Sequence, residues 1–482
     1  MKLKKIVKVG ILIAVIGLSS ACGNKPQQSS NGGVSEVKWY IPTVMEGKDK
    51  KEVLDKVNQM MSDKYGIKLN MVMIDAGNYS QKLQVINAGR EKYDLAFTCN
   101  WTNDYYTNVA NNALMDITEL LPKYAPKTYE ATDKNVWDAT KVDGKIYAVP
   151  NWQIQAKSAC VNIRKEYLDK TGFSIDDINT LDSIEAYLTK LHEVKPDCNI
   201  LGNMWNYYKY FYGIEPIVSE NLPTAIYFDK DGAPKIFNQY ETDEYRKYAE
   251  KMYSWVQKGL VTDKYDPQID AGKLGRSPLG VFLYKPGIAE DYSRQYGTEM
   301  VSKPISKGVL AGSGILATMT GVSATCDQTD KALEVIEIMN TDKDIYRTLC
   351  WGIEGKHYEK TSENQIKLVE NSGYDRISDW MLGSVMNSFV MSDQTPDLYE
   401  QTKKWNDEAV VSPLIKVHFD TNSISTELAN CQTVLKEQEE MINRGLVNDP
   451  AAAIDKMNSD LKKAGLDRVI EVLQAQVDEQ LK

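Results

Sequence analysis

Apolar and polar positions alternate after residue 35 in a pattern that predicts short strands separated by helices. Strand-like runs that are followed by helical spacing indicate a sheet with crossover connections, so we expect an α/β fold. Ligands of such sheets bind beyond the carboxyl ends of strands, which draws attention to the segments after Pro42 and Thr98. The first elements that we predict are strands over Glu36–Pro42, Ile67–Ile74 and Tyr93–Thr98, and helices over 48–66 and Tyr79–Ala88.

The rest of the chain continues this alternation and then becomes helical. The pair Asp449 and Pro450 is typical of a helix start, because Asp caps orphan amides and Pro fits the first turn. We predict a hairpin and strand over Val142–Trp152, strands over Leu279–Gly287 and Ile315–Cys326, and helices over Leu181–His192, Thr242–Lys258, Asp330–Asn340, Glu427–Arg444, 450–465 and Leu466–Leu481.

The first 22 residues have the layout of an export signal. Four lysines up to Lys8 precede the apolar run Ile11–Leu18, which is too short for a permanent membrane span, and small residues lead to Cys22. The block resembles a bacterial lipoprotein signal, although Ser19 stands where that motif usually has Leu. We expect cleavage after residue 21, lipidation of Cys22 and a flexible tether over 22–35. The alternative is an ordinary secretory signal.

Composition narrows the function classes. A chain of 482 residues predicts two domains, and a net charge of -10 argues against nucleic acid, because phosphate binding needs clustered Lys and Arg. The 28 Tyr and 9 Trp against 8 Phe suit half-wet surfaces. Beyond Cys22 the cysteines are scattered without a CxxC pair, which favours buried free thiols over a disulfide framework. No motif predicts a catalytic residue, a metal site or a cofactor.

Several motifs together resemble one protein family. Asp94–Pro126 (DLAFTCNWTNDYY…) and Asp143–Gly172 (DGKIYAVPNWQ…) resemble bacterial extracellular solute-binding proteins of family 1, the sugar ABC-transporter type. Trp351–Glu359 (WGIEGKHYE) and the tail from Ser412 onward resemble its LipO-like lipoprotein subfamily, whose characteristic C-terminal region has no known function. The resemblance covers nearly the whole mature chain.

The resemblance implies a type II periplasmic-binding-protein-like clamp with hinge strands and a helical C-terminus. We expect crossings near Gln155, Tyr284 and Gly321. Lobe 1 would hold residues 36–155 and 285–320, and lobe 2 residues 156–284 and 321–482. A monomer anchored by lipid on the extracellular face of the membrane would close on a small ligand, which in this family is a sugar, and pass it to permease subunits.

Sugars need flat aromatic platforms edged with amide, carboxylate and basic groups, and several segments supply that mixture. In residues 203–213 (NMWNYYKYFYG) we expect the first half to be such a platform, with Tyr210, Phe211 and Tyr212 as packing. The expected ligand-binding residues are Tyr40, Asn100, Trp101, Asp104, Trp152, Trp205, Asn206, Tyr208, Tyr284, Lys285, Trp351 and Glu354, with Trp380 nearby.

The resulting prediction is a lipid-anchored, non-enzymatic receptor that binds a carbohydrate, an oligosaccharide rather than a single sugar, for an ABC importer. Other functions stay open. The same rings suit a receptor for a peptide or another polar solute. A surface glycoside hydrolase would combine such platforms with two carboxylates, and a structural adhesin would not close on any ligand.

Overall fold

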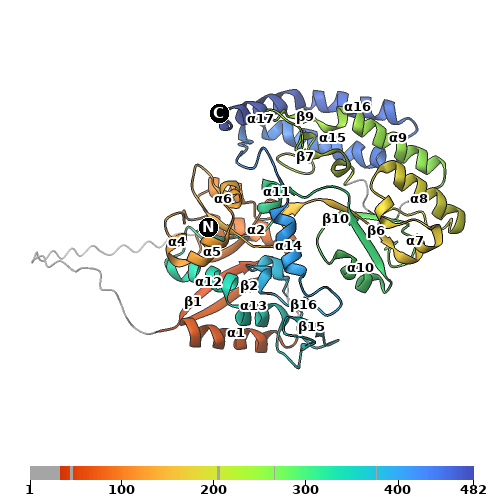
Figure 1. The fold of residues 1–482 in the computed structure, drawn as a ribbon. Coiled ribbons are helices and arrows are strands. Elements are labelled where there is room, and N and C mark those ends of the chain that lie inside the picture. Colours follow the sequence, from red (N-terminus) through yellow and green to blue (C-terminus); the bar gives the residue numbers. More distant parts are fainter. Residues whose placement is uncertain (1–32, 44–46, 203–206, 265, 267, 376) are drawn as a thin grey trace, which may run out of the picture.

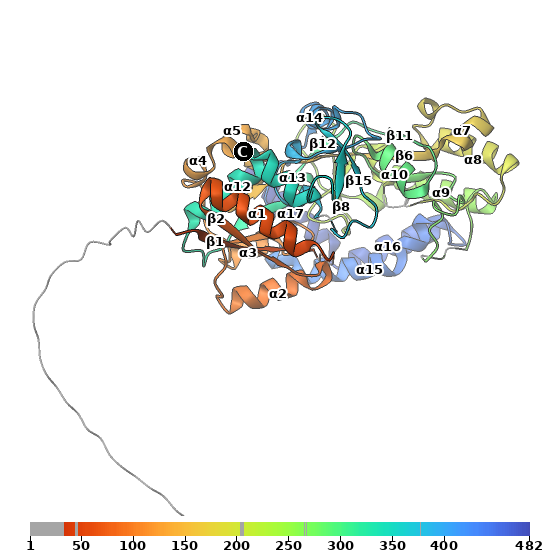
Figure 2. The ribbon, with the colours of Figure 1, turned by 90° about the horizontal axis from the view of Figure 1, so that it is seen from below.

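The computed structural model describes residues 33–43, 47–202, 207–264, 266, 268–375 and 377–482. They form two lobes that lie side by side in both views and have separate buried cores (Figure 1, Figure 2). We define lobe 1 as residues 33–155 and 311–409, and lobe 2 as residues 158–308 and 412–482. This is the two-lobed α/β architecture that the resemblance implies.

Lobe 1 is built on a five-stranded sheet in the order β2-β1-β3-β13-β4. Strand β1 pairs with β2 and β3 in parallel, and β13 runs antiparallel between β3 and β4. The carboxyl ends of β1, β3 and β4 therefore meet at one edge, beside the start of β13. The strands are β1 (Ser35–Ile41), β2 (Ile67–Met73), β3 (Leu95–Thr98), β4 (Ala148–Pro150) and β13 (Met319–Val322).

The helices of lobe 1 follow from local pattern. In α1, Val53, Val57 and Met61 recur every fourth residue and are buried, and Gly66 ends the helix at a φ of 66°. A small sheet of β14 (Tyr358–Lys360), β15 (Gln365–Leu368) and β16 (Val390–Met391) extends the lobe. The helices are α1 (Lys50–Tyr65), α2 (Ala76–Ala88), α3 (Tyr105–Ala110), α4 (Leu121–Tyr124), α5 (Pro126–Ala131), α6 (Lys134–Thr140), α11 (Gly312–Ile315), α12 (Thr329–Thr341), α13 (Lys343–Trp351) and α14 (Leu398–Asp407).

Lobe 2 combines two three-stranded sheets, β10-β6-β11 and β7-β8-β9, with long helices. The last three helices lie together along the top of Figure 1, and the Asp449 side chain caps α16 at the amide of Ala452, as predicted. The elements are β6 (Ala159–Arg164), β7 (Ile214–Pro216), β8 (Thr224–Tyr227), β9 (Phe237–Asn238), β10 (Gly280–Leu283), β11 (Met300–Pro304), α7 (Lys165–Thr171), α8 (Leu181–Val194), α9 (Asp243–Gln257), α10 (Ile288–Tyr296), α15 (Ser425–Asn443), α16 (Pro450–Lys463) and α17 (Leu466–Gln480).

Three short strands connect the lobes and pair in the order β17-β12-β5. They are β5 (Ala156–Lys157), β12 (Val309–Leu310) and β17 (Val410–Val411). Gln155 lies next to the first crossing, as expected. Tyr284 instead follows β10 in lobe 2, and Gly321 lies within β13 in the sheet of lobe 1, so neither marks a crossing.

The lobe boundaries also differ from those expected from the sequence. Residues 285–304 stay with lobe 2, because β11 pairs with β6. Residues 321–391 pack in lobe 1, because the crossing at β12 returns the chain there and β13 joins β3. Strand pairing between distant segments decided both assignments, and local hydrophobic patterns do not predict such pairing.

The structure also shows the state of the cysteines, the apolar character of the helices and the clustering of potential metal ligands. Cys99, Cys160, Cys198, Cys326, Cys350 and Cys431 are buried free thiols, in agreement with the preferred prediction. Within the described ranges, no helix has the length and apolar character needed to cross a membrane. The same residues contain no cluster of three or more His, Cys, Asp or Glu that could hold a metal ion.

Candidate functional site

The loop after β3 presents an aromatic ring at the carboxyl edge of the lobe 1 sheet. Trp101 is 55% exposed, although its indole Nε1 donates to the carbonyl oxygen of Ala317 at 2.7 Å. The Asn100 side chain donates to the carbonyl oxygen of Ser313 at 2.9 Å. Both acceptors lie in the segment after the crossing strand β12. The ring is thus held by its polar atom, while about half of its surface stays exposed.

A second indole lies beside it. The ring centroids of Trp101 and Trp380 are 6.4 Å apart, and Phe97 packs against both. The Thr318 hydroxyl donates to the carbonyl oxygen of Trp380 at 2.9 Å, and the buried Asn151 amide donates to the carbonyl oxygen of the next residue at 2.9 Å. We call Trp101 and Trp380 the tryptophan pair. It offers flat apolar surface on a fixed backbone.

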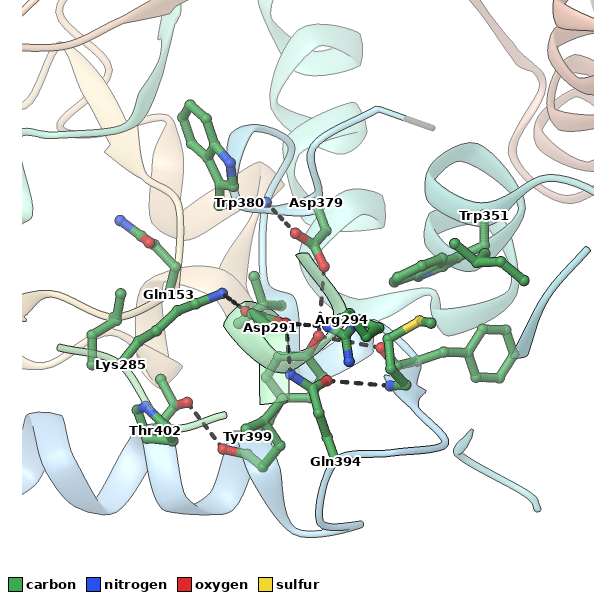
Figure 3. A pocket seen from close by; sticks show the side chains of 17 residues that line it. Gln153, Lys285, Asp291, Arg294, Trp351, Asp379, Trp380, Gln394, Tyr399 and Thr402 are labelled. Atoms are coloured by element: carbon green, nitrogen blue, oxygen red, sulfur yellow. Dashed lines mark hydrogen bonds and ion pairs between the residues drawn. The ribbon is translucent and has the colours of Figure 1, made fainter. Parts of the chain in front are cut away.

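A cavity of about 350 Å³ lies between the lobes next to Trp380 (Figure 3). We call it the interlobe pocket. Lobe 1 contributes the two residues 153–154 before the crossing strand β5, together with α13, residues 379–394 and α14. Lobe 2 contributes α10 and the turn before it. Its shape therefore depends on how the lobes sit. It is lined by Gln153, Ile154, Lys285, Pro286, Asp291, Arg294, Trp351, Leu368, Asp379, Trp380, Val385, Phe389, Met391, Gln394, Leu398, Tyr399 and Thr402.

The charged groups on the lobe 2 wall are paired. Asp291 accepts Lys285 Nζ at 2.5 Å, and it also pairs with Arg294. Arg294 reaches across to Asp393 in lobe 1, and Gln394 donates to Asp291 at 3.0 Å. Burial works to lower the pKa of Arg294, but the hydrogen bond to Asp393 and the charge of Asp291 outweigh it and raise the pKa. This wall is charged and internally neutralised.

The opposite wall carries a further indole, that of Trp351, whose polar atom is bonded within the protein. Trp351 Nε1 donates to the hydroxyl oxygen of Ser388 at 2.9 Å, and that hydroxyl donates to Asp379 at 3.1 Å. Tyr399 also donates to Asp379, at 3.5 Å. Figure 3 shows Trp351 and Trp380 to either side of the Asp291, Arg294 and Gln394 group. The pocket thus combines aromatic walls with amide, hydroxyl and charged groups.

The structure places only part of the expected site at this pocket. Lys285 and Trp351 line it, and Trp101 is joined to it through Trp380. Asn100 is exposed beside Trp101, and Trp152 is half-buried one residue before Gln153, with its carbonyl oxygen bonded to the amide of Val385.

Other expected residues have structural partners elsewhere. Tyr40 is buried in the lobe 1 core against Tyr93. Asp104 caps α3 at the amide of Thr107 at 2.8 Å. Exposed Glu354 pairs with Lys360 at 2.8 Å, and half-buried Tyr284 packs on Trp405 at 4.4 Å between ring centroids. Each of these four residues therefore has a contact within the protein outside the pocket.

The tyrosine-rich segment divides differently from the prediction. Tyr208 is 2% exposed, stacks on Tyr248 at 4.8 Å and donates to the Gln239 side-chain oxygen at 2.8 Å. It belongs to the lobe 2 core rather than to a platform. Trp205 and Asn206 lie outside the described residues. Tyr210 is buried and Phe211 and Tyr212 pack against the same core, as expected for packing residues.

Sequence reasoning missed most polar groups of the pocket, including Gln153, Asp291, Arg294, Asp379 and Gln394. Asp291 and Arg294 lie on α10, directly after the Lys285–Gly287 turn that the sequence did single out. A helix whose first turn is acidic and whose last turn is basic reads as ordinary dipole matching, so nothing local marks these side chains as pocket residues.

Comparisons with known proteins agree with this architecture. A curated relative from Streptococcus pneumoniae serotype 4 (strain ATCC BAA-334 / TIGR4), described as a carbohydrate ABC transporter substrate-binding protein, is 26% identical over 488 residues, covering 98% of this chain and 97% of the relative. The N-glycan transport solute-binding protein (NgtS) from Streptococcus pneumoniae is 24% identical, with a TM-score of 0.82 over 93% of this chain and 99% of that one.

The same protein in complex with Man5GlcNAc gives a TM-score of 0.69 at 25% identity, covering 93% of this chain and 98% of that one. Residues 413–482 match a family model described as a domain of unknown function (DUF3502). These comparisons confirm the expected two-lobed fold, and over nearly its whole length the chain is similar to solute-binding proteins of carbohydrate ABC transporters. The named relatives are substrate-binding and transport proteins, which agrees with the expectation of a receptor.

Proposed function

We propose that this protein captures a neutral oligosaccharide in the interlobe pocket and along the tryptophan pair, and hands it to the permease of an ABC importer. The observation that carries the proposal is the pairing of exposed Trp101 with Trp380 at the mouth of a pocket lined by both lobes. Indole faces suit the apolar faces of sugar rings, and the amide and hydroxyl groups nearby suit sugar hydroxyls.

The charge arrangement supports a neutral ligand. Both basic side chains among the described pocket residues are already ion-paired, Lys285 with Asp291 and Arg294 with Asp291 and Asp393. A sugar carboxylate would have to displace one of these aspartates and leave it unpaired, which costs free energy. Hydroxyl groups can instead add hydrogen bonds to the existing pairs.

The site also supports closure on the ligand. A ligand that touches both lobes binds the closed arrangement better and shifts the population toward it. The TM-score is 0.82 for NgtS and 0.73 and 0.69 for its complexes with Man1GlcNAc and Man5GlcNAc, so the overall arrangement here differs more from the two sugar complexes.

Calorimetry tests the ligand class. We expect heat with Man5GlcNAc or another neutral oligosaccharide, and none with alginate oligosaccharides or peptides of similar size. Heat with a peptide alone would favour the alternative receptor. Release of product from chromogenic glycosides would favour a hydrolase. If only the acidic oligosaccharides bound, the charge argument would be wrong while the class of receptor would stand.

We also propose that the mature chain begins at a lipidated Cys22, is held on the extracellular face of the membrane by the tether, and is a monomer. The support is the signal-like sequence up to Cys22 and the polar run that follows it. Intact-mass measurement of the membrane fraction should show a diacylglyceryl mass on Cys22. A mature chain without lipid would refute the anchor, and light scattering that gives twice the chain mass would refute the monomer.

A further inference from the structure

The family model of unknown function begins where the chain leaves the last crossing strand, and this first segment touches both lobes. We call residues 412–420 the strap. Leu414 and Val417 are buried in the core of lobe 2. Ile415 is buried in a separate cluster with Val136 of α6 in lobe 1. The turn-like backbone of the strap thus sends neighbouring side chains to opposite lobes.

Three kinds of contact join the strap to lobe 1. Ile415 packs against Val136 and Ala139, and Lys416 Nζ lies 3.5 Å from the carboxylate of Asp138. His418 Nδ1 lies 3.0 Å from the hydroxyl of Tyr106, with the rings edge to face at 5.6 Å. Burial lowers the pKa of His418, so the neutral imidazole can accept this hydrogen bond at neutral pH.

The last helix fixes the strap from the side of lobe 2. Gln480 accepts from the amide of His418 at 2.9 Å and donates to its carbonyl oxygen at 2.8 Å. Gln476, one turn earlier, makes the same pair of bonds to Asp420, both at 2.8 Å. In both views the end of α17 lies on the side of lobe 1 (Figure 1, Figure 2). Four hydrogen bonds from two glutamine side chains therefore hold the backbone of the strap on α17.

We propose that residues 413–482 form an interlobe brace: α17 holds the strap, and the strap holds lobe 1 in the arrangement seen here. Tyr106 belongs to α3, which begins directly after the loop that carries Trp101. Because these contacts join the lobes outside the interlobe pocket, a rotation that closes the pocket has to shift or break them. The brace therefore sets the free-energy cost of closure and, through it, the affinity for ligand. This last step rests on the proposed function.

Chain geometry supplies a matched control. Gln474 on the same helix also makes a pair of hydrogen bonds to the backbone. It accepts from the amide of Ile236 and donates to the carbonyl oxygen of Pro234. Those partners lie within lobe 2. The double variant Gln476→Ala/Gln480→Ala loses the brace, whereas Gln474→Ala loses the same kind of bond without affecting the contact between lobes.

The test measures the distance between lobes without sugar. Dyes on Val85→Cys in α2 and Val194→Cys in α8, both exposed positions, report the distance by single-molecule energy transfer. We expect the double variant to broaden the distance distribution and move it toward shorter distances, with Tyr106→Phe giving a smaller shift in the same direction. Gln474→Ala should match the parent protein. Identical distributions for the double variant, Gln474→Ala and the parent would overturn the brace.

Sugar affinity is a separate readout. We expect the double variant to bind the oligosaccharide about threefold to tenfold more tightly, because closure costs less. If the parent binds no sugar but the double variant still shortens the distance, the brace stands and the proposed ligand class is wrong. If the distance shifts and affinity for a bound sugar stays constant, the brace does not control closure and the proposal is wrong.

Discussion

Two groups of aromatic residues in this protein differ in burial and in the partners of their polar atoms, although both come from segments rich in aromatic residues. In the tryptophan pair at the edge of lobe 1, Trp101 is 55% exposed, and its indole N–H donates to a carbonyl oxygen of the same lobe. The tyrosine cluster of lobe 2, made of Tyr208, Tyr240, Tyr245 and Tyr248, is buried, and its hydroxyls meet groups of the core such as Gln239 and Asn443. Aromatic density alone does not identify a ligand platform.

The difference lies in where the polar atom of each ring finds its partner. Tyr245 and Tyr248 reach Asn443 on α15, so the cluster bonds the family region of unknown function to the rest of lobe 2. Trp101 is held through its indole N–H by the carbonyl oxygen of Ala317, Trp380 is held through its own carbonyl oxygen by the Thr318 hydroxyl, and both rings remain at least partly exposed to a ligand. The comparison predicts that one group determines stability and the other affinity.

The largest effect is expected in the tyrosine cluster. Tyr248→Ala removes a fully buried ring and its bond to Asn443, and should lower the free energy of unfolding by about 3–5 kcal/mol, as large core truncations do. Chemical denaturation measures this, and the folded fraction should bind sugar with unchanged affinity. A stable variant with weakened binding would reverse the roles of the two groups.

The tryptophan pair should show the opposite behaviour. Trp101→Ala and Trp380→Ala should each weaken oligosaccharide binding about tenfold to a hundredfold, which is the loss of an aromatic stacking surface worth about 1.5–3 kcal/mol. The melting temperature of Trp101→Ala should stay close to that of the parent, because the ring is largely exposed. Calorimetry and thermal denaturation on the same samples give both values, and unchanged affinity in both variants would remove the pair from the site.

The carboxyl group of Glu215 in lobe 2 makes the stability of the protein depend on pH, and so tests further which groups of lobe 2 determine stability. Burial raises the pKa of Glu215 from its usual 4.5 to about 7, and the Ser412 hydroxyl donates to it at 3.0 Å. The folded protein therefore binds more protons than the unfolded chain between these values, and stability falls as pH rises from about 4.5 through 7.

Replacing this carboxyl should remove that pH dependence. Glu215→Gln should be more stable than the parent at pH above 7 by about 1–2 kcal/mol, after allowance for the residue's partial exposure, and nearly equal to it near pH 4.5. Denaturation curves at several pH values measure the difference. A parallel shift at all pH values would contradict the assignment.

The smallest effect concerns a single hydroxyl in the tyrosine cluster. Tyr208→Phe keeps the ring stack but leaves the Gln239 side-chain oxygen without that donor, so we expect a loss of about 1 kcal/mol in stability. Sugar affinity should not change. Weakened binding in this variant would support the original prediction that Tyr208 is part of a ligand platform.

Local pattern predicted most elements, because their determinants lie within one turn or one strand. Val53, Val57 and Met61 predicted α1, and Asp449 with Pro450 predicted the start of α16. The motif around Trp101 predicted an exposed indole after β3. The same reasoning placed Tyr208 on a platform, because a tyrosine beside Trp and Asn looks alike in sequence whether its hydroxyl meets water or Gln239.

The sequence by itself determined the alternation of strands and helices and indicated the class of protein and an export signal, since these depend on residue order and short-range physics. Only the tertiary structure decided which lobe holds residues 321–391, that Asp291 and Arg294 of lobe 2 contact Gln394 and Asp393 of lobe 1, and that the strap lies between α17 and α3. Each of these depends on pairing between segments that lie from 56 to more than 300 residues apart, and the free energy of such contacts is set by the whole fold rather than by neighbouring residues.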